Sequence, residues 1–170
     1  MPEARGPRRH TFGAEIDWTG DRGVGTVDYR AYTRDHTIRG DGQAPILGSS
    51  SPEFRGDPSR YNPEELLVAS LSACHMLWYL HFCAVNGVTV VAYRDSAVGT
   101  MVEEGDGGGR FTEVVLRPRV RIARGSPETA RALHAPAHAK CFIASSVNFP
   151  VRVEPTIETA GPTASEPGSP

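Results

Sequence analysis

Hydrophobic and polar residues alternate over the first part of the chain, in the manner of strands with one buried face. Residues 11–18 place Phe12, Ala14, Ile16 and Trp18 on one side, and residues 25–33 resemble a second strand. The turn-forming segment 19–23 separates these two runs, so the pattern predicts an opening hairpin. Residues 40–61 are rich in Gly, Pro, Ser and charged side chains and predict a long loop.

A helical period replaces the alternation over residues 62–86. Asn62 suits the N-cap, with Pro63 in the first turn and Glu65 completing a capping box, and Gly87 suits the C-terminal end. Spacings of three and four residues predict one buried stripe, formed by Leu67, Leu71, Cys74, Trp78 and Phe82. The length and apolar character predict a central helix that is buried on most sides.

The second half of the chain returns to alternation. Residues 88–98 and 111–123 predict a hairpin with a flexible glycine-rich tip at 104–110. Ser126 and Pro127 begin a second helix, which Pro136 is expected to kink or end. A short apolar turn over 141–147 and a last strand over 149–157 follow. Strands and helices in this segregated order predict an α+β fold.

Composition narrows the class of protein. A chain of 170 residues suits one domain, which we assign to residues 11–157, with disordered tails at 1–10 and 158–170. Lys and Arg number 18 against 20 Asp and Glu, so the net charge of −2 gives no reason to expect a nucleic-acid partner. No apolar run is expected to reach the length of a membrane span, and no secretory signal is recognisable, so we expect a cytoplasmic protein.

The cysteines are the candidate chemical groups. Three cysteines are too few for a disulfide scaffold, and in a reducing compartment paired cysteines are more often catalytic, redox-sensing or metal-binding. Cys74 lies within the long helix and Cys141 just beyond a helix end, and either could be an inert packing thiol. Cys83 lies half a helical turn away from Cys74 and is interpreted as packing.

Two motifs resemble the OsmC/Ohr family, named after osmotically induced protein C and organic hydroperoxide resistance protein. The first is Asn62-Pro63-Glu64 leading to Ser72-Ala73-Cys74, and the second is His138-Ala139-Lys140-Cys141. The resemblance implies antiparallel sheets packed around a long central helix in an intertwined homodimer. It also implies a peroxidase that reduces organic hydroperoxides, and hydrogen peroxide more weakly, without a metal or cofactor.

The resemblance also implies roles for individual residues. Cys74 corresponds to the cysteine that attacks the peroxide, and Cys141 to the one that resolves the product as a disulfide. Glu64 corresponds to a carboxylate that holds an arginine against the thiolate. Arg55 is favoured as that arginine and Arg22 is the alternative, whereas Arg39 and Arg60 are interpreted as solvated or salt-bridged surface groups. The family's reductants imply a thiol donor such as a lipoylated protein.

Some features depart from the family or allow other functions. His75 follows Cys74 where an aromatic residue is common, and Phe142 follows Cys141 where proline is common. Glu64 and Cys74 are ten residues apart, which is ~15 Å along a straight helix, so a shared site requires a partner chain or a broken helix.

The histidines are expected at the surface or in an interface. The alternatives are a non-catalytic ligand-binding or stress protein with inert cysteines, and a zinc site at Cys74, Cys141 and a histidine.

Overall fold

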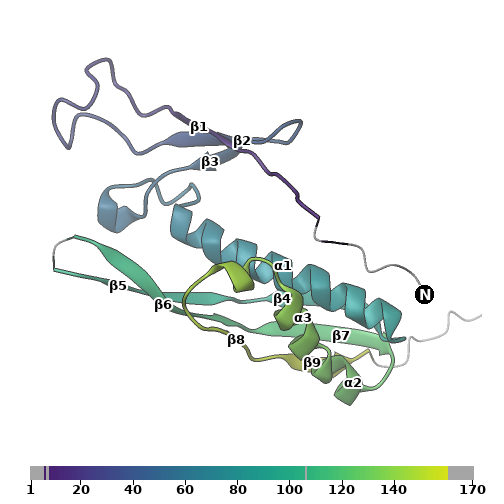
Figure 1. The fold of residues 1–170 in the computed structure, drawn as a ribbon. Helices are drawn as coiled ribbons and strands as arrows, with labels where there is room; N and C mark the ends of the chain where they lie inside the picture. The colour runs from purple at the N-terminus through teal and green to yellow at the C-terminus, as the bar shows by residue number, and fades with distance from the viewer. Residues whose placement is uncertain (1–5, 7, 106, 161–170) are drawn as a thin grey trace, which may run out of the picture. The chain divides into compact units, whose positions relative to one another are not determined.

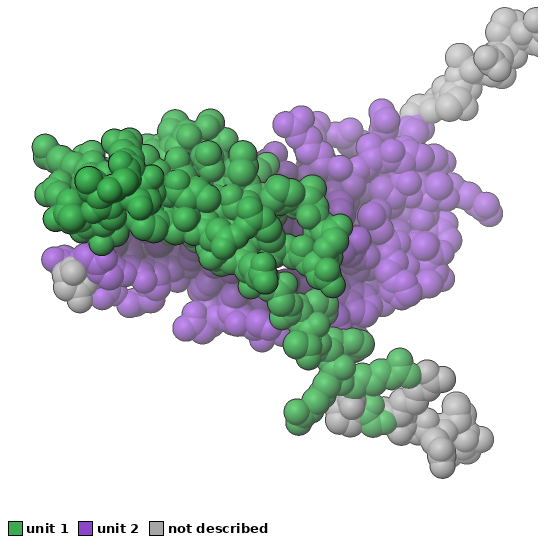
Figure 2. All heavy atoms as spheres, turned by 90° about the horizontal axis from the view of Figure 1, so that it is seen from above, with its two compact units in different colours: residues 1–65 green, residues 66–170 purple. Residues whose placement is uncertain are grey.

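The computed structural model describes residues 6, 8–105 and 107–160 of the chain. The chain divides into two compact units at residue 65, and Figure 2 colours them separately. The predicted disordered tails fall largely outside the described residues, as does one residue of the predicted tip at 104–110.

The first unit contains one small antiparallel sheet. Its strands are β1 (Glu15–Trp18), β2 (His36–Arg39) and β3 (Ile46–Gly48), in the order β1-β2-β3. A 3-10 helix, η1 (Pro52–Phe54), follows the sheet (Figure 1). The predicted long loop at 40–61 therefore contains β3 and η1, because Ile46 and Leu47 provide a short strand that pairs with β2.

The predicted strand over residues 25–33 is wrong, and so is the hairpin that it would form. Turns and bends occupy this segment, and β1 pairs instead with β2. Local polar contacts explain the difference. The Asp28 carboxylate accepts a hydrogen bond from the Arg30 amide at 2.8 Å, and the Arg34 guanidinium donates to the carbonyls of Tyr29 and Tyr32. These contacts offer the backbone an alternative to a strand ladder.

The long helix is present as α1 (Pro63–Val85), and both predicted caps are confirmed. The Asn62 side chain accepts from the Glu65 amide at 2.8 Å, and the Glu65 carboxylate accepts from the Asn62 amide at 3.2 Å. At the other end Gly87 adopts φ +72°, and the Val88 amide donates to the Cys83 carbonyl at 2.9 Å. Both ends thus satisfy backbone groups that a helix leaves unpaired.

The buried stripe of α1 differs from the predicted one by about one residue. The buried positions are Leu71, His75, Tyr79 and Cys83, spaced four apart. Cys74 lies at the edge of this stripe and is half-buried. The helix is apolar on several sides, so the sequence did not define the direction of the core. The expectation that α1 is buried on most sides is also wrong, because Leu77 and Val85 are more than 60% exposed, at 63% and 64%.

By length and hydropathy, α1 could also cross a membrane, so the expectation that no apolar run would reach the length of a membrane span is wrong. Its mean hydropathy reaches 1.5 over an 18-residue window, of which 22% is buried. These two criteria do not distinguish a membrane helix from a helix whose apolar faces pack on protein. The packing of α1 on the strands of the second unit favours the second explanation.

The second unit contains two mixed sheets and two short helices (Figure 1). One sheet has the order β4-β7-β9 and the other β5-β6-β8. The strands are β4 (Thr89–Asp95), β5 (Val98–Glu103), β6 (Gly109–Leu116), β7 (Pro118–Arg124), β8 (Val151–Val153) and β9 (Thr156–Thr159). The pairings β4–β7 and β5–β6 are antiparallel, whereas β8 and β9 pair in parallel with β6 and β7. The α+β class is confirmed, but the sheets are not wholly antiparallel.

The predicted hairpin over 88–123 is present with a bend in both arms. Asp95 lies at this bend, where its carboxylate accepts from the Arg117 amide at 2.7 Å and from the Ser72 hydroxyl at 2.6 Å. The last predicted strand is likewise divided, because Pro155 lies between β8 and β9 and cannot donate to a ladder.

The second predicted helix is two helices, α2 (Pro127–Ala132) and α3 (His134–Lys140), and Ser126 caps the first. The interruption lies at Leu133 rather than at Pro136. Pro136 is in the first turn of α3, where a missing N–H costs little. A 3-10 turn, η2 (Ala144–Ser146), follows α3, as the short apolar segment predicts.

Two apolar clusters hold the second unit together. One joins Tyr79 and Cys83 of α1 to Val120 and Ile122 of β7 and to Ala137 of α3. The other joins Leu71 of α1 to Val114 and Leu116 of β6. Because α1 contributes to both clusters, it is the common support for the sheets and for α3.

Candidate functional site: a pair of neighbouring thiols

The central feature of the second unit is the contact between the side chains of Cys74 and Cys141. Cys74 comes from the middle of α1 and is half-buried, whereas Cys141 caps the C-terminal end of α3 and is fully buried. The two side chains lie within hydrogen-bonding reach of each other, and both are free thiols. Residues 67 positions apart along the chain are therefore brought together without a covalent link.

The end of α3 holds Cys141 by its backbone. The Cys141 amide donates to the His138 carbonyl at 3.1 Å, and the Ala144 amide donates to the Cys141 sulfur at 3.4 Å. Burial raises the pKa of the Cys141 thiol to about 11, and the hydrogen bond with Cys74 adds to the effect. Cys141 therefore keeps its proton at neutral pH and can donate it toward the Cys74 sulfur.

Cys83 is a packing residue, as the sequence predicts. It is 1% exposed, it belongs to the cluster around Tyr79, and burial raises the pKa of its thiol. Burial inside an apolar cluster is typical of a structural cysteine and shields the Cys83 thiol from reagents in solvent.

Two histidines that were expected at the surface or in an interface, His75 and His134, are in fact buried and in contact with each other. His75 and His134 are 0% and 4% exposed, and the His75 Nε2 and His134 Nδ1 atoms are 2.9 Å apart. Burial lowers the pKa of His75 to about 4 and that of His134 to about 3, so both are neutral near pH 7. The four-residue spacing of Leu71, His75 and Tyr79 was the sequence signal that could have placed His75 inside.

The residues that the structure describes contain no group of three or more His, Cys, Asp or Glu side chains arranged to hold a metal ion. A zinc site built from Cys74, Cys141 and a histidine therefore has no support in this arrangement.

The favoured arginine, Arg55, lies in the first unit directly after η1. It is exposed, its φ is +66°, and its amide donates to the Pro52 carbonyl at 3.0 Å. A left-handed conformation is unfavourable for a residue with a β-carbon, and such strain occurs often at functional sites. The next residue must be small, because a β-carbon on Gly56 would lie 1.5 Å from the Ser50 carbonyl oxygen.

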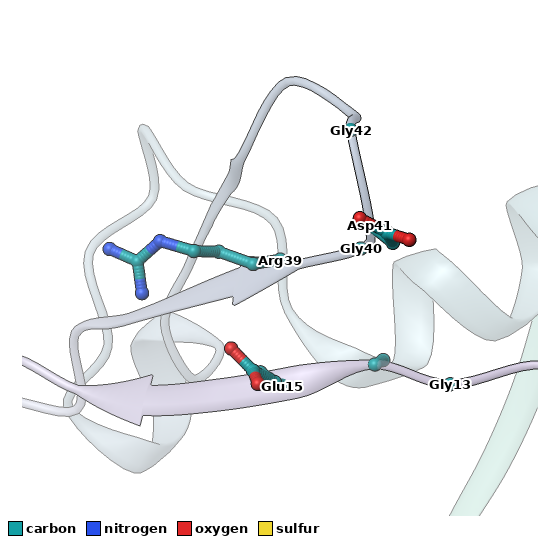
Figure 3. Close-up of a pocket in the computed structure, with 7 residues that line it drawn as sticks. Gly13, Glu15, Arg39, Gly40, Asp41 and Gly42 are labelled. Atoms are coloured by element: carbon teal, nitrogen blue, oxygen red, sulfur yellow. The ribbon is translucent and has the colours of Figure 1, made fainter.

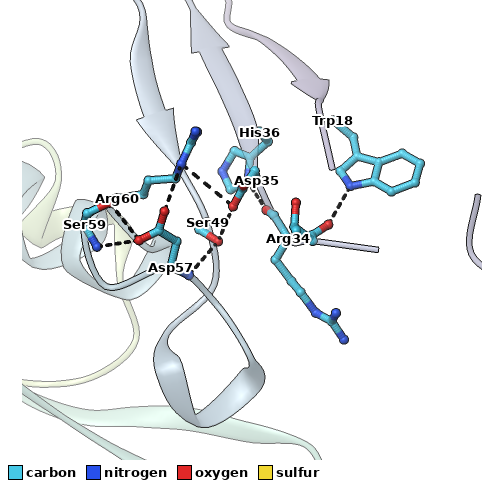
Figure 4. A network of polar contacts seen from close by, with 9 residues as sticks. Trp18, Arg34, Asp35, His36, Ser49, Asp57, Ser59 and Arg60 are labelled. Atoms are coloured by element: carbon cyan, nitrogen blue, oxygen red, sulfur yellow. Dashed lines mark hydrogen bonds and ion pairs between the residues drawn. The ribbon is translucent and has the colours of Figure 1, made fainter. Parts of the chain in front are cut away.

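A polar network fixes the loop that carries Arg55 (Figure 4). The Ser49 hydroxyl donates to Asp35 and accepts from the Asp57 amide, both at 3.1 Å. Arg60 lies 3.8 Å from the Asp35 carboxylate and 3.5 Å from that of Asp57. The segment around Arg55 is thus anchored to the small sheet rather than left loose.

The other arginines have simpler surroundings. Arg60 and Arg39 are ion-paired, Arg39 with Asp17, in agreement with the sequence analysis. Figure 3 shows a shallow hollow beside Arg39, lined also by Glu15 and Asp41, in which the Arg39 side chain points away from Asp41. Arg22 lies in an exposed turn that the Asp21 carboxylate stabilises by accepting from the backbone amides of following glycines.

Glu64 is half-buried in the first turn of α1, and α1 continues without interruption past Cys74. Glu64, Arg55 and Arg22 belong to the first unit, and both thiols belong to the second. The structure thus brings together Cys74 and Cys141, while the roles of the three charged residues stay predictions.

The fold and this site define an α+β protein built on one long helix, with two free thiols in contact at its middle. Residues 56–156 match the model of the OsmC-like protein family. The chain therefore belongs to the OsmC family, and the resemblance stated from its two cysteine motifs is confirmed.

Solved structures agree with this assignment. An OsmC-like protein of unknown function from Vibrio cholerae is 35% identical, with a TM-score of 0.78, over 87% of this chain and 100% of that one. An organic hydroperoxide resistance protein OsmC from Legionella pneumophila is 18% identical (TM-score 0.62; 89% and 99% of the two chains). An organic hydroperoxide resistance protein from Elizabethkingia anophelis is 17% identical (TM-score 0.63; 90% and 99%) and shares the fold. A comparison with curated proteins found no match.

The different environments of the thiols predict different rates of alkylation. Iodoacetamide added to the folded protein at about pH 8 is expected to label Cys74 first, because Cys83 and Cys141 are buried and have raised pKa values. Labelling of Cys141 should rise only as the pH approaches its pKa of about 11. Peptide mass spectrometry measures each site, and denatured protein, in which all three should react alike, is the control. Equal labelling of Cys74 and Cys141 in folded protein would contradict this assignment.

Proposed function

We propose that this protein is a thiol-dependent peroxidase that reduces organic hydroperoxides, and hydrogen peroxide more weakly, to alcohols. The observation that carries the proposal is the contact between the free thiols of Cys74 and Cys141, which belong to different helices. Two free thiols that are hydrogen-bonded neighbours are candidates for a disulfide, which forms when their α-carbons lie within a narrow range. Membership of a family that includes proteins named for hydroperoxide resistance supports the same reaction class.

The environments of the two thiols support the division of roles. Cys74 is the more exposed thiol, so a peroxide can reach it, whereas Cys141 has no exposed surface. Cys141 keeps its proton, because burial and the contact with Cys74 raise its pKa to about 11. That proton is available when the Cys141 sulfur attacks the oxidised Cys74 and water must leave.

The proposed reaction has two steps. The Cys74 thiolate attacks the terminal peroxide oxygen, the O–O bond breaks, and the leaving alkoxide takes a proton and departs as an alcohol. Cys74 is then a sulfenic acid. The Cys141 sulfur attacks the sulfur of Cys74, and the hydroxyl leaves as water with the proton from Cys141, which gives the disulfide. A thiol donor such as a lipoylated protein then reduces the disulfide, and a cytoplasmic location would suit this donor.

We assign Arg55 as the positive charge near Cys74 and Glu64 as the carboxylate that orients it. A guanidinium can stabilise a thiolate and donate to peroxide oxygens at once, and a carboxylate can hold its planar fork by paired hydrogen bonds. The strained backbone and the anchored loop of Arg55 favour it over Arg22.

We also propose that the active protein is a homodimer. The unbroken α1 places Glu64 ~15 Å along the helix axis from Cys74, so a partner chain would bring its Glu64 to this thiol. Exposed apolar side chains support an interface on the second unit, since Leu77 is 63% exposed, Val85 64% and Phe142 70%. Such residues on one helix and its neighbour are typical of a protein contact.

Three cysteine variants test the reaction. Cys74→Ser should abolish peroxide turnover, because serine cannot be oxidised to a sulfenic acid. Cys141→Ser should allow one oxidation of Cys74 and then stop at a sulfenic acid that dimedone traps. Cys83→Ser should retain turnover, since Cys83 only packs.

Intact-mass spectrometry after one equivalent of an organic hydroperoxide gives the decisive readout. The wild type should lose two protons and yield a peptide that links Cys74 to Cys141. Thiols that remain reduced under these conditions would favour the alternative, a non-catalytic ligand-binding or stress protein with inert cysteines.

An arginine series tests the assigned charge. Arg55→Lys keeps the charge but removes the planar fork, so we expect the rate of Cys74 oxidation to fall about 10- to 100-fold. Stopped-flow measurement of Cys74 oxidation with an organic hydroperoxide gives this rate. The matched variant Arg22→Lys should have a much smaller effect. If Arg22→Lys lowered the rate of Cys74 oxidation more than Arg55→Lys, the role would be assigned to Arg22.

Substitution of Leu77 tests the proposed dimer. Leu77→Glu should convert a dimer into monomers, because a carboxylate would be buried in an apolar contact. Analytical ultracentrifugation measures the mass, and peroxidase assays should show the activity falling with the dimer fraction. Val98→Glu, at an exposed position on β5, is the matched control. A fully active monomer would refute the shared site.

A further inference from the structure

The hydrogen-bonded pair of His75 and His134 has no part in the reaction as proposed. The His75 Nε2 and His134 Nδ1 atoms are 2.9 Å apart, and the two rings are nearly parallel, with 8° between their planes. Tyr79 also stacks on the His134 ring, with ring centroids 3.9 Å apart. The pair is therefore a packed and directed contact between α1 and α3.

The histidine contact attaches one end of α3 to α1, and the thiol contact attaches the other end of α3. His134 is the first residue of α3, and Cys141 is its C-cap. Their partners on α1, His75 and Cys74, are adjacent in sequence. The position of Cys141 relative to Cys74 therefore depends on how firmly the other end of α3 is held.

The rings of His75 and His134 have no other hydrogen-bond partners among the described residues that could replace their mutual hydrogen bond. The second ring nitrogens, His75 Nδ1 and His134 Nε2, are buried and have no hydrogen-bond partner among the described residues. Because burial lowers the pKa of both rings, neither is charged at neutral pH, and one ring donates while the other accepts. Breaking the bond would leave a buried polar atom unsatisfied, which is unfavourable.

We propose that His75 and His134 are positioning residues that hold α3 so that Cys141 can close a disulfide with Cys74. For the peroxide-driven step this inference rests on the proposed function. The disulfide requires the two α-carbons to approach within a narrow range, about 4.4–6.8 Å. An α3 that is loose at His134 would spend less time in that range, so closure would slow while the first attack on peroxide would not.

A matched pair of variants separates the hydrogen bond from shape. In His134→Asn a polar atom of the asparagine side chain occupies the place of the Nδ1 atom that bonds to His75. In His134→Leu the side chain has nearly the same shape as asparagine but no polar atoms. We expect His134→Leu to slow disulfide closure about tenfold and to increase the fraction trapped by dimedone. His134→Asn should recover most of the rate. Oxidation of Cys74, measured in the Cys141→Ser background, should be the same in both.

A second measurement needs no peroxide. Equilibration of the protein with mixtures of reduced and oxidised glutathione gives the effective concentration of Cys141 at Cys74, which should fall about tenfold in His134→Leu and much less in His134→Asn. If hydroperoxides fail to oxidise wild-type Cys74, the proposed function fails, but this equilibrium still decides the positioning role.

Equal behaviour of His134→Leu and His134→Asn in both measurements would overturn the inference, whether both match the wild type or both lose closure alike. If His134→Leu does not fold, the same comparison can be made at the other ring. His75→Gln keeps a polar atom near the Nε2 position, and His75→Met has a similar shape without a hydrogen bond of that strength.

Discussion

The contact between the thiols of Cys74 and Cys141 is the interaction on which the chemistry of this protein depends. It exists because α1 packs on both sheets of the second unit while α3 packs on α1. Each helix alone would carry an unremarkable cysteine. The fold makes them a pair, and it gives one thiol access to solvent and the other a buried, protonated state.

Much of this fold could be predicted from local signals. The capping box at Asn62 and Glu65 and the glycine after α1 define the long helix to within a residue or two, because caps satisfy specific backbone groups. The direction of its buried face was not predictable in the same way. The helix is apolar on several sides, and the strands and α3, which pack against it, determine that His75 and Tyr79 face the core.

The site was less accessible to sequence reasoning than the fold. The cysteine motifs indicate two thiols that belong together, but not that Cys141 would be fully buried, or that His75 and His134 would form a buried hydrogen bond. Contacts between residues 59 positions apart leave no periodic trace in a single sequence. The misplaced strand at 25–33 has a different cause, since the Asp28 and Arg34 side chains satisfy the backbone locally and prevent a ladder.

The parallel strands β8 and β9 have a consequence for how the protein is made. Both follow Cys141 in the chain, and they complete the two sheets by pairing with β6 and β7. During synthesis from the N-terminus, both cysteines are therefore made before the strands that complete the two sheets. A nascent chain would therefore pass through a stage in which its sulfur atoms are unprotected, and an oxidising encounter at that stage could join the wrong partners.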